Sequence, residues 1–138
     1  MGVRSDMTRY ERVLLVDDNE ADNFFHSIMI ERAGYAGEVV AFDSGRAALD
    51  YLATASDVTM LILLDINMPA MSGFEFAGLA EPLLRSRLRR AKIVMLTSSS
   101  ADSDREQARK SNQIDSYIVK PLNVDMARRV LDGDFDAL

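Results

Sequence analysis

The segment Met60–Pro69 reads MLILLDINMP, an unbroken apolar run followed at once by an acid, with an amide and a Met-Pro pair just beyond. A run of this kind is typical of a strand that is buried on both faces, as in a parallel sheet covered by helices. It is far shorter than the roughly 20 residues that a membrane-spanning helix needs. Asp65 is therefore expected where the chain leaves a buried strand.

Four more short apolar runs lie on either side of this segment, and helix-like patterns separate them. The expected strands are Arg12–Val16, Glu38–Phe42, Met60–Leu64, Lys92–Leu96 and Asp115–Val119. Strict alternation of strands and helices predicts right-handed crossovers and a parallel sheet with helices on both faces. The fold class is therefore α/β, a doubly wound five-stranded sheet, and 138 residues suit one such domain.

The first expected helix covers residues 20–33. Asn19 fits an N-cap, and Gly34 fits the left-handed position that often ends a helix. His26 on this helix is expected to be a surface or partly packed side chain. The apolar residues that should face the sheet from this helix are Ala21, Phe24, Phe25 and Ile28.

The later helices carry signals of their own. The third, Phe74–Leu84, should bend or end at Pro82, which has no backbone N–H to donate. The fourth, Asp102–Ser111, is almost wholly polar and is expected at the surface, with Asn112 as a left-handed cap. The fifth covers Asn123–Leu131.

Composition excludes several classes of function. The chain has 22 acidic and 16 basic residues, a formal charge of −6, which argues against a nucleic-acid binder with a basic face. It has no cysteine, and its one histidine excludes multi-histidine metal sites. Because no signal peptide or membrane span is recognisable, we expect a cytoplasmic protein that binds neither nucleic acid nor membrane.

Acidic, hydroxyl and ammonium side chains follow four of the expected strands. Asp17 and Asp18 follow the first, Asp65 the third, Thr97 the fourth and Lys120 the fifth. The carboxyl ends of parallel strands meet at one edge, where such sheets bind their ligands. Three carboxylates gathered there would repel one another, so we expect them to bind a hard divalent cation, of which Mg²⁺ is the natural choice.

Motifs in a fixed order make this pattern more specific. They are VDD at 16–18, LLDINMP at 63–69 followed by Gly73, LTSS at 96–99 and YIVKP at 117–121. Over about residues 11–131 the chain resembles a response-regulator receiver domain, the CheY-like phosphoacceptor module of two-component signalling. The resemblance implies the flavodoxin-like receiver fold with strand order 2-1-3-4-5.

The resemblance also implies the roles of the acids. Asp65 matches the aspartate that accepts the phosphoryl group. Asp18 matches the acid that binds Mg²⁺ directly, and Asp17 its neighbour, which usually acts through a water. Asn67 matches the position whose backbone carbonyl binds the metal, alongside Asp65 itself.

The remaining matched positions concern the response to phosphorylation. Lys120 matches the lysine that pairs with the acceptor and then with the phosphoryl oxygens. Thr97 matches the hydroxyl that closes on the phosphoryl group, and Tyr117 the aromatic switch whose rotamer follows it. Pro121 matches a proline that usually follows a cis bond, which would aim the lysine inward.

We therefore expect a stand-alone response regulator with a receiver domain at 11–132, a flexible lead-in at 1–10 and a tail at 133–138. It would take a phosphoryl group from a histidine kinase or a histidine phosphotransfer protein and catalyse only its own phosphorylation and dephosphorylation. It would then bind a target protein or pass the group on. The expected target surface is formed by the fourth helix, fifth strand and fifth helix, and a homodimer is left open.

Two alternatives remain open. The first is an unphosphorylated, receiver-like interaction module, although such modules typically lose one or more of the site residues. The second is an aspartyl-phosphate hydrolase of the haloacid-dehalogenase type. That chemistry needs a second acid two residues after the nucleophile, where this chain has Asn67.

Overall fold

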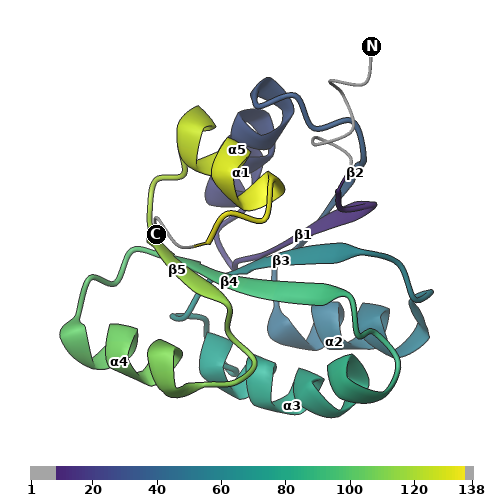
Figure 1. Cartoon of the computed structure of the whole chain (residues 1–138). Coiled ribbons are helices and arrows are strands. Elements are labelled where there is room, and N and C mark those ends of the chain that lie inside the picture. The colour runs from purple at the N-terminus through teal and green to yellow at the C-terminus, as the bar shows by residue number, and fades with distance from the viewer. Residues whose placement is uncertain (1–8, 136–138) are drawn as a thin grey trace.

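The computed structural model describes residues 9–135, which form a parallel sheet covered by helices (Figure 1). The strands lie in the order β2-β1-β3-β4-β5. This confirms the expected α/β class and the strand order of the receiver fold. The strands are β1 Arg12–Val16, β2 Glu38–Phe42, β3 Met60–Leu64, β4 Ala91–Thr97 and β5 Ser116–Val119. The helices are α1 Glu20–Arg32, α2 Gly45–Thr54, α3 Gly73–Ser86, α4 Asp102–Lys110 and α5 Val124–Leu131.

Helices α1 and α5 cover one face of the sheet, and α2, α3 and α4 cover the other (Figure 1). The chain runs from β1 outward to β2 and then crosses back to β3 on the opposite side of β1. This reversal makes β1 and β3 neighbours, with Val16 paired with Leu64 at their carboxyl ends. The next residues, Asp17 and Asp65, are consequently brought side by side.

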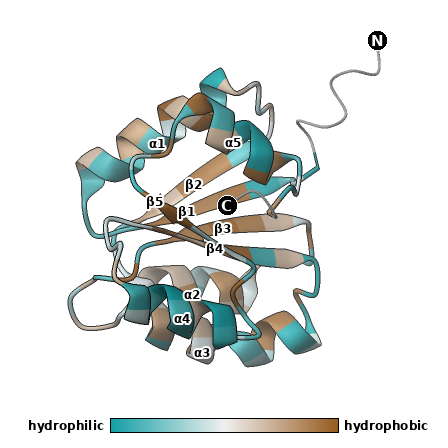
Figure 2. Cartoon of the chain, turned by 60° about the vertical axis from the view of Figure 1, so that its left-hand side comes forward, coloured by the Kyte–Doolittle hydropathy of each residue, from teal (hydrophilic) through white to brown (hydrophobic). Residues whose placement is uncertain are grey.

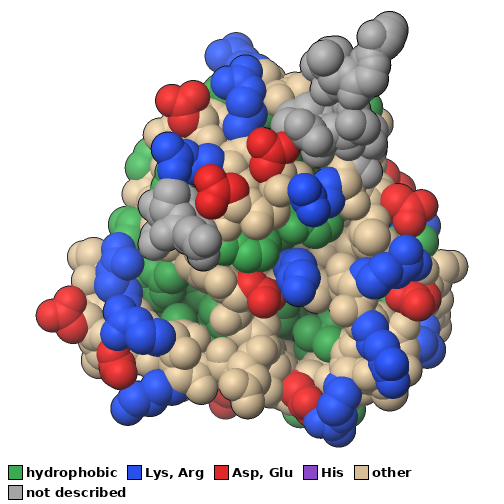
Figure 3. All heavy atoms as spheres, in the orientation of Figure 1, with side chains coloured by type: hydrophobic (Ala, Val, Ile, Leu, Met, Phe, Trp, Pro, Cys, Tyr) green, Lys and Arg blue, Asp and Glu red, His purple; other side chains and the backbone are tan. Residues whose placement is uncertain are grey.

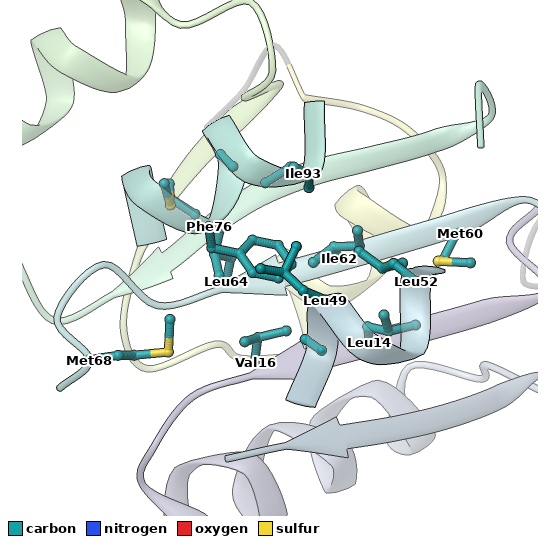
Figure 4. Packing of buried hydrophobic residues seen from close by; sticks show 14 of the residues in the cluster. Leu14, Val16, Leu49, Leu52, Met60, Ile62, Leu64, Met68, Phe76 and Ile93 are labelled. Atoms are coloured by element: carbon teal, nitrogen blue, oxygen red, sulfur yellow. The ribbon is translucent and has the colours of Figure 1, made fainter. Parts of the chain in front are cut away.

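The core consists of two apolar layers, one on each face of the sheet. All five residues of β3 are buried, as its unbroken apolar sequence predicts. Figure 2 shows largely hydrophobic strands between helices that carry both hydrophilic and hydrophobic residues. The layer toward α2 and α3 is centred on Phe76, which is fully buried between the sheet and its own helix (Figure 4). Burial of this kind stabilises the fold by about 1.5–3 kcal/mol for each large side chain.

The orientation of α1 differs from the expectation. Its buried residues are Asn23, His26 and Ile30, whereas Phe24 and Phe25 are 68% and 42% exposed. The Asn23 amide donates hydrogen bonds to the carbonyls of Asp17 (3.0 Å) and Phe42 (3.2 Å). These two bonds tie one face of the helix to the ends of β1 and β2, so the expected apolar stripe was wrong. The expectation of a surface or partly packed His26 was wrong as well, because this residue is 3% exposed.

Two helix ends also differ. Helix α3 continues through Pro82 to Ser86, and buried Phe76, Ala77 and Ala80 together with partly buried Leu83 and Leu84 anchor it on both sides of the proline. Helix α4 ends at Lys110, where the cap Ser111 is extended. Asn112 does not adopt a left-handed conformation, so it is not the expected cap. Gly34 does have a positive φ of 99°, as predicted for the end of α1.

Both ends of the described part of the chain pack against the sheet and its helices. Tyr10, placed in the lead-in by the sequence, is 5% exposed and its carbonyl accepts a hydrogen bond from the Tyr35 hydroxyl at 2.9 Å. In the tail, Phe135 packs partly against the layer toward α1 and α5. The rest of the lead-in (1–8) and of the tail (136–138) lies outside the described residues. Within residues 9–135, no helix is both long enough and apolar enough to span a bilayer.

Candidate functional site

Three acids meet at the carboxyl ends of β1 and β3. Asp17 and Asp65 are only 5% and 6% exposed, whereas Asp18 is exposed. The backbone N–H of Asp65 donates to the carbonyl of Val16 at 3.0 Å, which extends the β1–β3 pairing into the site. Each acid offers a carboxylate oxygen, and these oxygens all lie within 4.8 Å of one another. The convergence expected from the sequence is therefore present, and the cluster could hold a metal ion.

Local backbone contacts fix these acids in place. One carboxylate oxygen of Asp17 accepts a hydrogen bond from the N–H of Asn19 at 2.9 Å, just before α1 begins. On the other side, α3 begins at Gly73, whose N–H donates to the Ile66 carbonyl at 2.8 Å. A Cβ atom at Gly73 would lie 2.3 Å from the Asp65 carbonyl oxygen, so only glycine fits this close approach.

Lys120 enters the same pocket from the end of β5, next to a cis peptide bond to Pro121. Its Nζ atom lies 2.6 Å from a carboxylate oxygen of Asp17 and 2.8 Å from one of Asp22, but 3.7 Å from Asp65. Burial alone would lower the pKa of Lys120. The hydrogen bonds to Asp17 and Asp22 and the charge of Asp65 outweigh that effect and raise the pKa above its ordinary value, so the ammonium stays charged.

The Asp65 carboxylate has an unsatisfied oxygen. Its Oδ1 atom is buried and has no hydrogen-bond partner within residues 9–135. Burial raises the pKa of Asp65 above its ordinary value, while the Lys120 ammonium and the neighbouring Thr97 hydroxyl oppose that shift. A buried, unpaired carboxylate oxygen is costly unless another group binds it, so it points to a ligand that the pocket is built to receive.

Thr97 and Tyr117 lie on the next two strands of the sheet. Thr97 is the last residue of β4, and Tyr117 lies within β5. Thr97 is fully buried, and its side-chain oxygen accepts a hydrogen bond from the N–H of Ser99 at 3.3 Å. The Tyr117 hydroxyl donates to the carbonyl of the same Ser99 at 2.8 Å. The Arg105 guanidinium of α4 lies 4.9 Å from the centre of the tyrosine ring. Both residues therefore contact one loop, the segment between β4 and α4.

Two residues in or near the pocket were not anticipated from the sequence. Asp22 supplies a fourth carboxylate from the first turn of α1, and its N–H donates to the Asn19 side chain at 3.0 Å. His26 lies one turn further along the same helix. Its burial and the nearby Lys120 charge lower the pKa of His26, which favours the neutral ring. Their spacing in the sequence could have indicated that they lie together, because residues 22 and 26 share one helix face.

The Asn67 side chain and a hollow of the surface take no part in the contacts described above. The Asn67 side chain is exposed in the loop after β3. This hollow, of about 780 Å³, lies between α1 and β2 and is lined by residues that include Phe24, Tyr35 and Phe42. Neither Asp65 nor Lys120 lines it, so it is separate from the acid cluster.

Comparison with known proteins gives a consistent result. Residues 13–132 match the family model of the response regulator receiver domain. The chain is 34% identical over 124 residues to the probable methanogenesis regulatory protein FilR2 of Methanothrix harundinacea, covering 87% of this chain and 78% of that protein. It is 33% identical to the polar-differentiation response regulator DivK of Brucella ovis, covering 81% of this chain and 85% of that one.

A solved structure agrees with these sequence matches. The crystal structure of a two-component response regulator from Cytophaga hutchinsonii superposes with a TM-score of 0.80 at 28% identity. The match covers 91% of this chain and 97% of that one. The likeness therefore extends over most of both chains.

Proposed function

This chain belongs to the response regulator receiver family of two-component signalling, and on that premise we propose that Asp65 accepts a phosphoryl group from a phosphorylated histidine. The donor would be a histidine kinase or a histidine phosphotransfer protein, and the site would be cytoplasmic. The observation that carries this proposal is the buried Oδ1 of Asp65, which has no hydrogen-bond partner in the described part of the chain. It lies among Asp17, Asp18 and Lys120, which supply the charges that phosphoryl transfer requires.

The proposed transfer step forms one bond and breaks another. One carboxylate oxygen of Asp65 attacks the phosphorus and forms a P–O bond, while the P–N bond to the donor imidazole breaks. The electron pair of that bond stays on the imidazole nitrogen, and the product is an acyl phosphate. The carboxylate is a weak nucleophile, so positioning and charge neutralisation dominate the catalysis. The chain would catalyse only this step and the hydrolysis of its product.

The donor set fits a hard divalent cation, in keeping with the family. Three carboxylates with oxygens within 4.8 Å of one another, one of them bearing an unpaired buried oxygen, are the ligands that Mg²⁺ prefers. Asp17, Asp18 and Asp65 would hold it together with the backbone carbonyl of Asn67. When bound, the ion would neutralise part of the negative charge on the phosphoryl oxygens.

Lys120 and Thr97 would neutralise and hold the remaining phosphoryl oxygens. The Lys120 ammonium, 3.7 Å from Asp65, needs only a short movement to reach an attached phosphoryl group. Thr97 and Tyr117 both form a hydrogen bond with Ser99. A shift of the Thr97 hydroxyl would therefore alter the contact that Tyr117 makes with this loop. The surface of α4, β5 and α5 would thereby report phosphorylation to a target protein.

The partner class follows from charge and family. On the face shown in Figure 3, acidic and basic side chains are interspersed rather than gathered into a basic surface, and the net charge is −6. These features support a protein target rather than nucleic acid. Neither alternative is favoured by a specific observation. The acids and the lysine converge as an intact set, and the position that a hydrolase would use for a general acid holds Asn67.

The proposal is tested by labelling with acetyl phosphate and excess Mg²⁺, read on a gel that retards phosphoproteins and by intact mass. The wild-type chain should acquire one acid-labile adduct, and Asp65→Asn should acquire none. Asp50→Asn is the matched control, because Asp50 is an exposed acid on α2 whose only ion pair within the described residues is to Arg46. Label that persists on Asp65→Asn would move the acceptor to another residue and overturn the assignment.

A further inference from the structure

We propose that Asp22 is a positioning residue, which holds the Lys120 ammonium on the Asp17 side of the pocket and away from Asp65. This inference deepens the proposed function and rests on it. Nothing in the motif pattern assigns a role to Asp22. The proposal rests on where the single ammonium of the pocket lies among the carboxylates that surround it.

The Lys120 ammonium lies closer to two of the surrounding acids than to the third. Its Nζ atom makes hydrogen bonds of 2.6 Å to Asp17 and 2.8 Å to Asp22. The separation from Asp65 is 3.7 Å, beyond a hydrogen bond, and among residues 9–135 the Oδ1 atom of Asp65 has no hydrogen-bond partner. The two acids that accept hydrogen bonds from Lys120 are therefore Asp17 and Asp22, and the expected phosphoacceptor Asp65 is not one of them.

The contact between Asp22 and Lys120 differs from the ordinary ion pairs of this surface. The Lys120 side chain is 12% exposed, whereas the cation of every other salt bridge within residues 9–135 is at least 28% exposed. Asp22 is 38% exposed, so it reaches the pocket from its rim. A shielded ion pair is screened less by solvent than an exposed one.

The backbone around Asp22 is also fixed. Its N–H donates to the N-cap Asn19, and the next residue, Asn23, bonds to the carbonyls of Asp17 and Phe42. These contacts hold the first turn of α1 against the ends of β1 and β2. The carboxylate of Asp22 therefore starts from a defined place, and less conformational entropy is lost when it binds the lysine.

Removing the charge of Asp22 should have two opposite consequences. The ammonium would lose one of its two close partners and turn toward Asp65, where it could neutralise an incoming phosphoryl group more fully. At the same time the pocket would carry one negative charge fewer, and a divalent cation would bind more weakly. A residue that merely stabilised the fold would not separate these two effects.

The experiment compares Asp22→Asn, the conservative Asp22→Glu and the exposed control Asp50→Asn, which changes the net charge equally. The lysines of this chain are Lys92, Lys110 and Lys120, so NMR can follow the Lys120 side chain directly in metal-free protein. Calorimetric titration gives the Mg²⁺ dissociation constant, and acetyl phosphate at saturating Mg²⁺ gives the phosphorylation rate constant. Circular dichroism verifies that each variant is folded.

For Asp22→Asn we expect a shifted Lys120 signal, a dissociation constant for Mg²⁺ about fivefold higher and a phosphorylation rate constant about threefold higher. Asp22→Glu should restore both constants toward wild type. If Asp22→Asn matches Asp50→Asn in the Lys120 signal and in the Mg²⁺ constant, the proposal is overturned. If the wild-type chain takes no phosphoryl group on Asp65, the proposed function fails, while those two measurements still decide the role of Asp22.

Discussion

Replacing Lys120 by methionine tests the charge balance of the pocket most directly. The substitution keeps an unbranched side chain, one atom shorter, and removes its charge. Asp17 and Asp65, which are 5% and 6% exposed, would then face each other without a cation, together with Asp22 at the rim. Removing one member of a buried ion pair costs about 3–5 kcal/mol. We expect about 3 kcal/mol in metal-free protein, the lower end, because Asp22 and Asp18 remain in contact with water.

Magnesium should reverse much of this loss. In the wild-type chain, Mg²⁺ at a hundredfold excess over its dissociation constant should raise the free energy of unfolding by about 2.7 kcal/mol. At the same Mg²⁺ concentration Lys120→Met should gain more, because its pocket is more negative and attracts the ion more strongly. It should nevertheless fail to transmit phosphorylation to a target protein, because the ammonium that binds the phosphoryl group is missing.

Urea unfolding followed by circular dichroism, in EDTA and in excess Mg²⁺ at matched ionic strength, measures these free energies. Lys110→Met is the control, because the Lys110 side chain is 76% exposed and its one ion pair among residues 9–135, to Glu106, spans 3.9 Å. The control should change stability by no more than about 0.5 kcal/mol. If Lys120→Met loses no more stability in EDTA than Lys110→Met does, Lys120 does not balance the acids and the account of the pocket is wrong.

Three further changes test other parts of the structure by urea unfolding. Gly73→Ala should cost about 1–3 kcal/mol and slow phosphorylation, because its Cβ would meet the Asp65 carbonyl, whereas Gly78→Ala, with nothing within 4 Å, should stabilise the same helix by about 0.5–1 kcal/mol; equal effects would contradict the close approach. Asn23→Ala should cost about 1–3 kcal/mol because it removes the donor from two carbonyls, while Phe24→Ala, which is exposed, should cost about 0.5 kcal/mol or less; the reverse order would refute the observed face of α1. Burial raises the pKa of Asp65, so its folded state binds a proton more readily than its unfolded state and stability from this group is lost as pH rises; metal-free Asp65→Asn should therefore be more stable than wild type at neutral pH, with an advantage that shrinks below the ordinary carboxyl pKa. A constant difference across that range would show that Asp65 is not strained by burial.

Much of the fold could be predicted from local patterns. The five apolar runs gave strands within one or two residues of those observed, and Asn19 and Gly34 mark the start and end of α1 as expected. Strand order came from the family resemblance rather than from the runs themselves. The placement of Asp17, Asp65 and Lys120 at one edge followed from topology, because parallel strands end on the same side of a sheet.

The tertiary structure alone decided the details that depend on distant contacts. The rotation of α1 is set by the bonds of Asn23 to two strand ends, which outweigh an apolar stripe that could face either way. Helix α3 passes through Pro82 because packing on both sides holds it. The hydrogen bonds of Lys120 to Asp17 and Asp22 depend on distances of a few ångströms between residues about 100 positions apart. A sequence pattern predicts which charged residues lie at one edge of the sheet. Only the tertiary structure determines which of them come within hydrogen-bond distance, because that depends on how the helices and strands pack.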